Sequence, residues 1–338
     1  MRTEIITVNP DNINPVYIKT AAEKIKGGGL VAFPTETVYG LGADAFNTQA
    51  IAKIFETKKR PLEDPLIVHI AQKEKLHTLA INIPDIVARL TDTFWPGPLT
   101  LVLKKAENIP DILTAGLDTV AIRMPANKIA LSFIEFCQTP IAAPSANLFG
   151  SPSPTCAQHV LDDLTGRIDL IIDGGKTEIG VESTVLDLTH NEPSILRPGG
   201  VSIERLNEVI KTVINSSSKN KVLSPGMYPR HYSPRARLIL VELEGREQVE
   251  KVKNLALEFS HKGQHIGIMA KDENKNRYRP FNVKLLGPGD NLATCAANLF
   301  SILREFDRLG VSVIIAEGVK KEGLGLAIMD RLRKAAGE

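Results

Sequence analysis

The sequence predicts an α/β protein: a twisted open mixed α/β sheet domain followed by a smaller Rossmann-like, three-layer αβα domain. Short runs rich in Val, Ile and Leu alternate with amphipathic helical runs along the 338 residues. In residues 1–214 this alternation is irregular, which favours a mixed sheet over a strictly parallel one. From Arg237 onward it becomes regular, as expected for a parallel sheet covered by helices.

The elements of the first domain follow from periodicity and from start and stop signals. The predicted helices are 16–27, 48–59, 72–80, 84–94, 127–137 and 155–164. The strands and strand-like runs are 30–33, 66–70, 99–103, 119–122, 168–172, 181–187 and 194–198, and residues 140–147 form a further apolar run that ends in polar groups. Thr48 is expected to cap the second helix, and the helix from Thr155 is expected to be capped. Pro34 ends the first strand because it cannot donate a ladder hydrogen bond. Gly40 and Gly42 predict a tight turn or a close approach of a ligand.

A linker is predicted at residues 215–236, with the first domain at 1–214 and the second at 237–338. Residues 215–221 are polar and of low complexity, which is typical of a linker. Residues 225–235 carry three prolines, two tyrosines, a histidine and two arginines, which a simple spacer rarely has. The second domain is expected to contain strands 237–242, 265–269, 283–286 and 311–316 and helices 246–260, 291–309 and 324–336.

Composition and charge disfavour several classes of protein. The net charge is +2, from 20 basic and 25 acidic residues in 1–214 and from 21 and 14 in 215–338. An acidic first domain weighs against RNA binding as the main activity. No apolar run is long enough to span a bilayer, and the first residues lack the core of a signal peptide. Three distant cysteines predict neither a disulfide framework nor a zinc site. We expect a cytoplasmic protein with no membrane association.

Several partial motifs are set aside. Residues 174–177 (Gly-Gly-Lys-Thr) lack the first glycine of a phosphate loop, because Leu170 stands there. Residues 323–328 lack the third glycine of a dinucleotide fingerprint, so packing is the better explanation. His261 and His265 flank Gly263, which disfavours a helical metal site. The remaining histidines without a motif are expected at the surface or in caps: His77, His159 and His190.

Polar and cationic side chains gather at the ends of the apolar strands and at helix ends. Lys58 and Arg60 suit either a solvated helix end or a phosphate clamp. His69, inside an apolar strand, is by itself best read as a core histidine, whereas a cation such as Arg123 needs a partner. The full set is Thr37, Lys58, Arg60, His69, Arg123, Ser145, Ser183 and Arg197. One cleft lined by such groups suits an anionic, phosphate-bearing ligand, with catalysis by positioning and charge stabilisation rather than by a protein nucleophile.

These residues lie in eight motifs that together resemble the YrdC-like threonylcarbamoyl-AMP synthases. The motifs are Phe33–Gly42, Lys58–Pro61, Pro65–His69, Trp95–Thr100, Val120–Pro125, Ala143–Asn147, Val181–Thr184 and Leu196–Gly199. Arg230–Pro234 and the βα tail resemble the longer, two-domain form. The resemblance implies an α/β domain with a large positive cleft, and a nucleotidyltransferase that makes L-threonylcarbamoyl-adenylate and pyrophosphate from L-threonine, bicarbonate and ATP. It also implies that the product supplies a transferase that modifies adenosine 37 of tRNAs reading ANN codons.

The resemblance also implies site residues. The L-threonine site would comprise Thr37, His69, Arg123, Ala143 (through its backbone) and Ser183. The ATP site would comprise Lys58, Arg60, Asp64, Thr119, Ser145, Asn147, Ser153, Arg197 and Tyr232, with Lys58 and Arg60 as the catalytic cations and Tyr232 in a lid. Mg²⁺ would be held mainly by the substrate rather than by protein ligands.

Two positions depart from the family pattern. Asp64 stands where the family usually has Asn, and a carboxylate beside a triphosphate needs a sugar hydroxyl, an arginine or a metal as its partner. Lys59 replaces a small or neutral residue and is expected to face solvent. Two rival functions stay open: a non-catalytic double-stranded-RNA or tRNA-binding module, and an accessory domain of a carbamoyltransferase.

Overall fold

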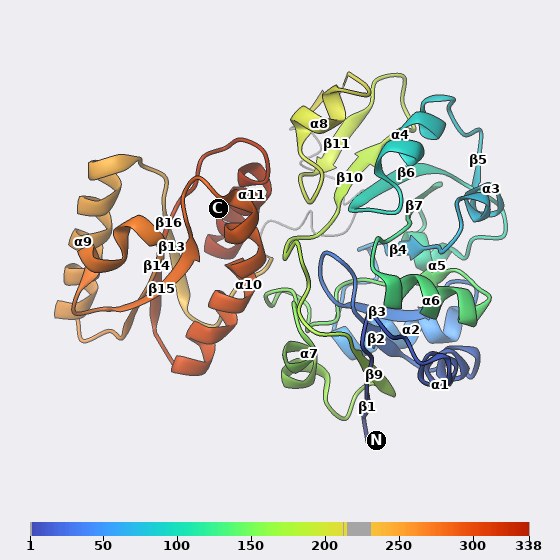
Figure 1. Cartoon of the computed structure of the whole chain (residues 1–338), viewed down its shortest axis with the longest axis horizontal. Coiled ribbons are helices and arrows are strands. Elements are labelled where there is room, and N and C mark those ends of the chain that lie inside the picture. Colours follow the sequence, from blue (N-terminus) through green and yellow to red (C-terminus); the bar gives the residue numbers. More distant parts are fainter. Residues whose placement is uncertain (1, 212, 215–230, 338) are drawn as a thin grey trace. The chain divides into compact units, whose positions relative to one another are not determined.

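The computed structural model describes residues 2–211, 213–214 and 231–337, which form two compact units. The first unit contains residues 2–149, 154–178 and 182–214; the second contains 150–153, 179–181 and 231–337 (Figure 1). Most of the predicted linker, residues 215–230, lies outside the described residues, so the domain boundaries stay predictions. In the described part of the chain, no helix has the length and apolar character needed to cross a membrane.

The first unit is built on one long mixed sheet. Its strands are β1 (Glu4–Thr7), β2 (Val31–Phe33), β3 (Gly40–Asp44), β4 (Ile67–His69), β5 (Ala80–Ile81), β6 (Leu99–Lys105), β7 (Thr119–Arg123), β8 (Ile141–Ala142), β9 (Leu170–Asp173), β10 (Thr184–Asp187), β11 (Ser194–Arg197) and β12 (Val213–Ile214). The order is β1-β9-β2-β3-β8-β4-β7-β6-β10-β11-β12, with β5 beside β6. Parallel pairs such as β4–β7 and antiparallel pairs such as β6–β7 occur together, which confirms the mixed sheet.

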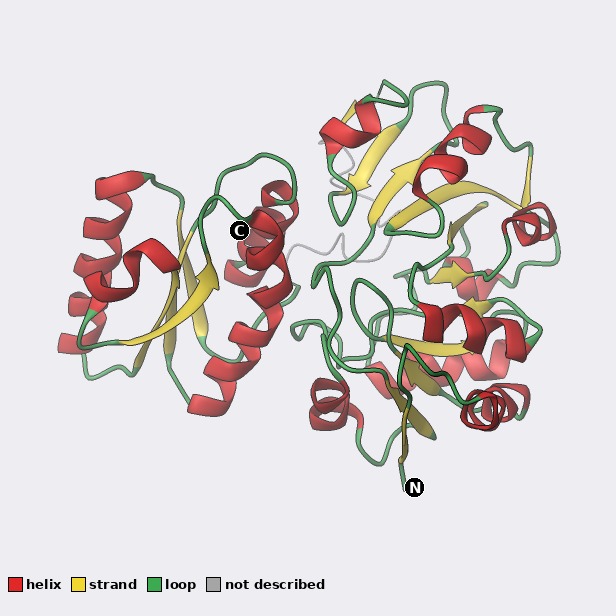
Figure 2. Ribbon diagram, in the orientation of Figure 1, coloured by secondary structure: helices red, strands yellow, loops and turns green. Residues whose placement is uncertain are grey.

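Helices cover both faces of this sheet (Figure 2). They are α1 (Pro15–Lys26), α2 (Thr48–Lys58), α3 (Leu76–Leu79), α4 (Ile86–Phe94), α5 (Asp111–Thr114), α6 (Lys128–Cys137), α7 (Ala157–Leu164) and α8 (Ile203–Asn207), with the 3-10 turn η1 (Lys73–Lys75) before α3. One hydrophobic cluster joins the sheet to α1 and α6, and a larger one joins it to α2, α4 and α7. Strand β2 contributes Val31 and Phe33 to the first cluster and Ala32 to the second, as the two-residue period of a strand requires.

The second unit contains a four-stranded parallel sheet. Its strands are β13 (Arg237–Val241), β14 (Ile266–Lys271), β15 (Asn282–Gly287) and β16 (Val313–Glu317), in the order β13-β16-β14-β15. Its helices are α9 (Gly245–His261), α10 (Leu292–Leu309) and α11 (Gly325–Ala336), and the 3-10 segment η2 is Asp272–Tyr278. Helix α9 lies on one face of the sheet while α10 and α11 lie together on the other (Figure 1). This arrangement confirms the predicted Rossmann-like three-layer αβα domain.

A buried carboxylate ends β16 in this second unit. Glu317 is fully buried and accepts hydrogen bonds from the backbone nitrogen of Lys271 (2.6 Å), from Asn274 Nδ2 (2.7 Å) and from the Tyr278 hydroxyl. These donors join the ends of β16 and β14 to η2. A buried charge is tolerated when its lone pairs are filled in this way.

Local expectations are wrong at several points, each for a physical reason. Asn47, not Thr48, caps α2 by accepting from Ala50 N. The helix expected from Thr155 begins at Ala157 and has no side-chain cap. His159, which is expected at the surface or in a cap, is buried, and its Nδ1 accepts a hydrogen bond from Thr155 N. Gly40 and Gly42 lie in strand β3 rather than in a tight turn. A Cβ on Gly42 would lie 2.9 Å from the Ile141 side chain, so close packing requires that glycine.

Candidate active site

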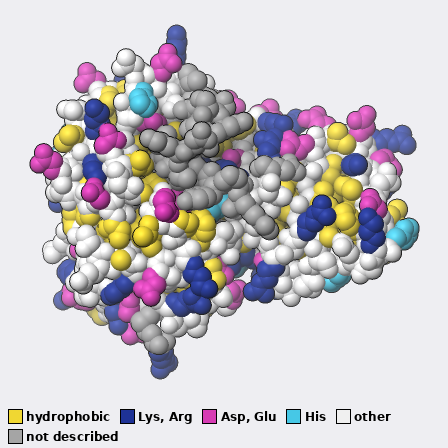
Figure 3. Space-filling view, turned by 180° about the vertical axis from the view of Figure 1, so that it is seen from behind, with side chains coloured by type: hydrophobic (Ala, Val, Ile, Leu, Met, Phe, Trp, Pro, Cys, Tyr) yellow, Lys and Arg dark blue, Asp and Glu magenta, His cyan; other side chains and the backbone are white. Residues whose placement is uncertain are grey.

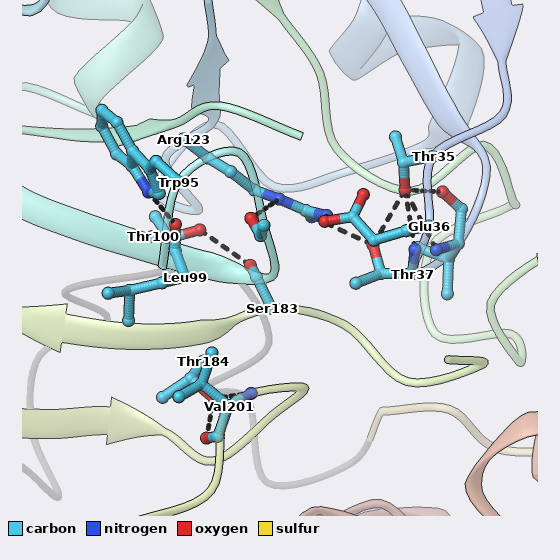
Figure 4. Close-up of polar contacts among 12 residues, drawn as sticks. Thr35, Glu36, Thr37, Trp95, Leu99, Thr100, Arg123, Ser183, Thr184 and Val201 are labelled. Atoms are coloured by element: carbon cyan, nitrogen blue, oxygen red, sulfur yellow. Dashed lines mark hydrogen bonds and ion pairs between the residues drawn. The ribbon is translucent and has the colours of Figure 1, made fainter. Parts of the chain in front are cut away.

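A threonine-pinned turn follows β2. Thr35 Oγ1 accepts from the backbone nitrogens of Thr37 and Val38, both at 3.2 Å, and contacts the Val38 carbonyl at 2.6 Å and Thr37 Oγ1 at 2.8 Å. Thr35, Glu36 and Thr37 are all buried. The turn therefore fixes the side chains of Glu36 and Thr37, which point toward the guanidinium of Arg123 (Figure 4).

Arg123 is the last residue of β7 and is buried, with 4% of its surface exposed. Its NH1 donates to Thr37 Oγ1 at 3.0 Å, its Nε donates to the Gly97 carbonyl at 3.3 Å, and its NH2 lies 2.6 Å from Glu36 Oε1. Glu36 and the 95–98 turn therefore hold the guanidinium at the strand end. Glu36 is therefore the charged partner that a buried arginine at this position needs, and it is not among the residues predicted from the sequence.

His69 lies beside Arg123, because β4 and β7 pair in parallel with these two residues in register. It is buried, its Nδ1 lies 3.3 Å from the Ile67 carbonyl, and the Phe33 ring meets it edge-on. Burial, with a smaller contribution from the Arg123 charge, lowers the pKa of His69 to about 3. The imidazole is therefore neutral at physiological pH.

Ser183 contacts both β6, the strand that pairs with β7 beside Arg123, and Arg197. Thr100, opposite Arg123 in the β6–β7 register, lies 2.7 Å from Ser183 Oγ through its hydroxyl. Arg197, the last residue of β11, donates to the Ser183 carbonyl from Nε (3.2 Å) and NH2 (2.9 Å), and to Ser183 Oγ from NH2 (3.2 Å). Gly199 permits this packing, since a Cβ there would lie 2.3 Å from the Glu182 carbonyl oxygen.

Lys58 ends α2 and is 1% exposed. Its ammonium group donates to the backbone carbonyls of Ser145 and Asn147, and its own carbonyl accepts from Phe149 N at 2.9 Å. Of the two alternatives for Lys58, the solvated helix end is therefore wrong. The lysine holds the 145–149 loop, which also runs beside β3 through the bridge between Gly40 and Ser145.

Arg60 and Asp64 form a buried ion pair at 2.9 Å. Arg60 also donates to the carbonyls of Asp64 (3.0 Å) and Pro65 (2.8 Å). Burial raises the pKa of Asp64, while the positive charges of Arg60, Lys58 and Arg197 oppose that rise. Asp64 therefore lies in the field of three site cations, and its partner is an arginine. Lys59, next to this group, is exposed as expected.

The structure brings the predicted cations and hydroxyls together, with exceptions. Ala143 is buried and its nitrogen donates to the Ile67 carbonyl at 2.9 Å, beside His69. Thr119 begins β7 while Arg123 ends it, so about 13 Å of strand separates them. In the described part of the chain, Thr119 shares no hydrogen bond with the other site residues.

Ser153 and Tyr232 belong to the second unit. Tyr232 is buried with a φ of 61°, and its ring packs 5.4 Å from that of Phe300 and under the guanidinium of Arg331. Ser153 is fully buried, and Arg304 donates to the carbonyl of its neighbour Pro152. The lid role predicted for the linker is not tested, because residues 215–230 lie outside the described residues.

Two residues of the site are absent from the set predicted from the sequence. Glu36 could have been selected from the sequence, because it is the one carboxylate in the polar run after β2. Thr100 could hardly have been selected, because a threonine inside an apolar strand is common. Its role appears only in the register that places it between Arg123 and Ser183.

Comparisons with known proteins show the family to which the chain belongs. A family model for Sua5, YciO and YrdC proteins, described as telomere recombination, matches residues 23–199, and one described as the threonylcarbamoyl-AMP synthase C-terminal domain matches residues 201–337. A threonylcarbamoyl-AMP synthase of Pyrococcus abyssi is 49% identical over 99% of this chain and 98% of its own. The chain belongs to the threonylcarbamoyl-AMP synthase family.

A further relative and two solved structures extend the comparison. The threonylcarbamoyl-AMP synthase of Bacillus subtilis is 46% identical, covering 96% of this chain and 94% of its own. The crystal structure of P. abyssi Sua5 complexed with L-threonine matches with a TM-score of 0.94 at 49% identity, covering 99% of this chain and 98% of that one. Escherichia coli YciO, at 27% identity and a TM-score of 0.53, covers 58% of this chain and 96% of its own.

Proposed function

We propose that this protein makes L-threonylcarbamoyl-adenylate and pyrophosphate from L-threonine, bicarbonate and ATP. The observation that carries this proposal is the similarity to threonylcarbamoyl-AMP synthases over nearly the whole chain. The site supports it independently, because buried cations and hydroxyls gather there. Such groups stabilise the negative charge of two small anions held side by side.

The reaction divides into two steps that this site suits. The threonine amine adds to bicarbonate with loss of water and forms an N-carboxylate. An oxygen of that carboxylate attacks the α-phosphorus of ATP, the bond from that phosphorus to the bridging oxygen breaks, and pyrophosphate leaves. The protein positions the reactants and stabilises negative charge on the phosphate, so no covalent intermediate with the protein is required.

The threonine end of the site is proposed at Arg123. A guanidinium matches a carboxylate with two parallel donors, and Thr37 and Ser183 add hydroxyls. His69, neutral and next in register, completes this end with the backbone at Ala143. Because Arg123 is buried and held by Gly97 and Thr37, little side-chain entropy is lost when it binds the substrate.

The ATP end is proposed around Lys58, Arg60 and Arg197. These cations flank Asp64, whose carboxylate is balanced by Arg60 and so does not leave a free negative charge beside the phosphates. The further residues assigned to ATP by family resemblance are Asp64, Thr119, Ser145, Asn147, Ser153 and Tyr232. Lys58 and Arg60 are the cations proposed to stabilise the phosphate during transfer.

A magnesium ion is part of the proposal. In the described residues no group of three or more carboxylates, imidazoles or thiols is arranged to hold a metal, and Asp64 is already paired with Arg60. Mg²⁺ prefers to keep water ligands and to bind substrate phosphates. We therefore assign it to the triphosphate of ATP, where it would offset phosphate charge.

The product is proposed to serve the N6-threonylcarbamoyl modification of adenosine 37 in tRNAs that read ANN codons. A separate transferase would take up the adenylate in the cytoplasm. The domains are proposed as 1–214 for catalysis, 215–236 as linker and lid, and 237–338 as the C-terminal domain.

A non-catalytic RNA-binding module fits the structure less well. Such a module needs lysines and arginines exposed to the phosphate backbone. Lys58, Arg60, Arg123 and Arg197 are only 1%, 7%, 4% and 3% exposed. On the face drawn in Figure 3, basic and acidic side chains are interspersed over both units.

The test is to incubate the purified full chain with ATP, Mg²⁺, L-threonine and bicarbonate and to analyse the products by mass spectrometry. We expect threonylcarbamoyl-adenylate and pyrophosphate in equal amounts. In a parallel incubation that also contains carbamoyl phosphate, consumption of carbamoyl phosphate instead of threonine would support the carbamoyltransferase hypothesis. Binding of tRNA that weakens with salt, without any turnover of ATP, would support the RNA-binding reading.

A further inference from the structure

Glu36 is a buried carboxylate at the proposed threonine end of the site. The family resemblance assigns it no role in binding or catalysis. It is 5% exposed, and its Oε1 lies 2.6 Å from Arg123 NH2. Burial of a carboxylate is costly unless a charge and hydrogen bonds compensate it. Arg123 supplies the charge, so the remaining question is where the hydrogen-bond donors come from.

Neither carboxylate oxygen of Glu36 has a hydrogen-bond donor among the described residues. The contact with Arg123 NH2 is close but not aligned as a hydrogen bond, whereas Arg123 NH1 and Nε make aligned bonds to Thr37 and Gly97. An ionised carboxylate has about four acceptor positions. Glu36 therefore presents unfilled acceptors beside an arginine that is held on its other edges.

The neighbouring groups make this place suited to a cation. The Arg123 charge is already opposed by Glu36, and His69 is neutral, so neither residue adds an unbalanced positive charge beside the carboxylate. Thr37 Oγ1, which accepts from Arg123, lies on the same turn and adds a hydroxyl oxygen. Figure 4 shows Glu36 and Thr37 on the same side of the Arg123 guanidinium.

An α-amino acid carries its carboxylate and its ammonium group on one carbon atom. A guanidinium and a carboxylate held in contact are the complement of that pair of charges. We propose that Glu36 binds the α-ammonium group of the L-threonine substrate while Arg123 binds its carboxylate. The inference rests on the proposed function, because it needs threonine at Arg123.

The pair also gives a reason for substrate choice. A site with Arg123 alone would take any small carboxylate. With Glu36 beside it, a carboxylic acid without an amine leaves the buried acceptors of Glu36 unfilled, which disfavours its binding. The site therefore selects the one class of acid that carries the amine on which the carbamoyl group is built.

The test measures binding of two ligands to the full chain by calorimetry, without ATP. L-Threonine carries the ammonium group, and (R)-3-hydroxybutyrate is the same molecule without it. For the wild type we expect tighter binding of threonine. Glu36→Gln should weaken threonine binding about 10- to 100-fold, the range expected for a hydrogen bond to a charged group, and should not weaken 3-hydroxybutyrate binding.

The controls separate this inference from the proposed function. Arg123→Gln should weaken both ligands, and Glu56→Gln, on the exposed face of α2, should weaken neither. Equal losses of both ligands in Glu36→Gln would mean that Glu36 only holds Arg123, and would overturn the inference. A wild type that binds no threonine would overturn the proposed function itself. If Glu36→Gln does not fold, Glu36→Asp replaces it: selective loss of threonine supports the inference and equal loss contradicts it.

Discussion

Arg197 donates hydrogen bonds to both oxygens of Ser183, the backbone carbonyl and the side-chain hydroxyl. The hydroxyl in turn contacts Thr100, which lies opposite Arg123 in the sheet. The two arginines that are proposed to hold different substrates are thus joined through one serine and one threonine. Displacing either guanidinium is expected to disturb both substrates.

Replacing Arg197 with lysine tests this coupling. A lysine cannot reproduce two parallel donors, so Ser183 would lose its fixed orientation. We expect kcat/KM for both ATP and threonine to fall at least about tenfold, which corresponds to roughly 1.4 kcal/mol. Pyrophosphate release at varied concentrations of each substrate measures both. Arg167→Lys, an exposed position, is the matched control, and a loss confined to ATP would argue against the coupling.

The ion pair between Arg123 and Glu36 predicts a non-additive effect on stability. Arg123→Ala leaves a buried, unpaired carboxylate and should lower the free energy of unfolding by about 3–5 kcal/mol. The double variant Arg123→Ala/Glu36→Ala removes both charges and should be more stable than Arg123→Ala alone. Urea unfolding of the four proteins of this cycle gives the coupling free energy. A double variant whose loss of stability equals the sum of the two single losses would show that the pair is not coupled.

His69 predicts a pH dependence of stability. Its pKa is about 3 in the folded protein, whereas the unfolded chain has the ordinary value of 6.5. Between these values the unfolded state binds a proton that the folded state excludes, so stability falls as the pH falls from 6.5. The slope contributed is up to about 1.4 kcal/mol per pH unit.

Urea unfolding at pH 7.5, 6 and 5 measures this slope. The wild type should lose more stability over this range than His69→Gln, which cannot take up the proton. His77→Gln changes an exposed histidine and should follow the wild type. Parallel curves for wild type and His69→Gln would show that His69 is not held neutral by its surroundings.

The second unit offers a test that is independent of the site. Tyr278→Phe removes one of the donors to the buried Glu317 and should lower the free energy of unfolding by about 1–3 kcal/mol. Tyr17→Phe, at a tyrosine that is 45% exposed, should change it by less than about 0.5 kcal/mol. Thermal or urea unfolding compares the two. Equal effects would mean that the Glu317 network adds little to stability.

The sequence predicts most elements and many site residues, because periodicity and strand-end chemistry are local signals. Arg123 and Arg197 are recognisable as cations after apolar strands, and both do end strands. The pairing of strands could not be predicted in the same way. β1 pairs with β9, which lies about 165 residues away, and the sequence of neither strand identifies the other as its partner. Short strands such as β5, with two residues, give too little periodicity to detect.

The contacts within the site are the part that local sequence cannot give. The resemblance names Arg123 and Ser183, but the roles of Glu36 and Thr100 depend on which strands are neighbours. Lys58 shows the same limit: from its place at the end of a helix, a solvated end and a phosphate clamp are equally possible. The fold buries it against the carbonyls of the 145–147 segment. Such contacts arise from long-range pairing and not from propensity.

The most direct test of the central claim is exchange of labelled pyrophosphate into ATP by the purified full chain. If one site holds the two substrates together, exchange should occur with ATP, Mg²⁺, L-threonine and bicarbonate, and should disappear when threonine or bicarbonate is left out. Arg123→Gln should abolish it at threonine concentrations that saturate the wild type. No exchange in the complete mixture, or the same exchange without threonine, would contradict the account.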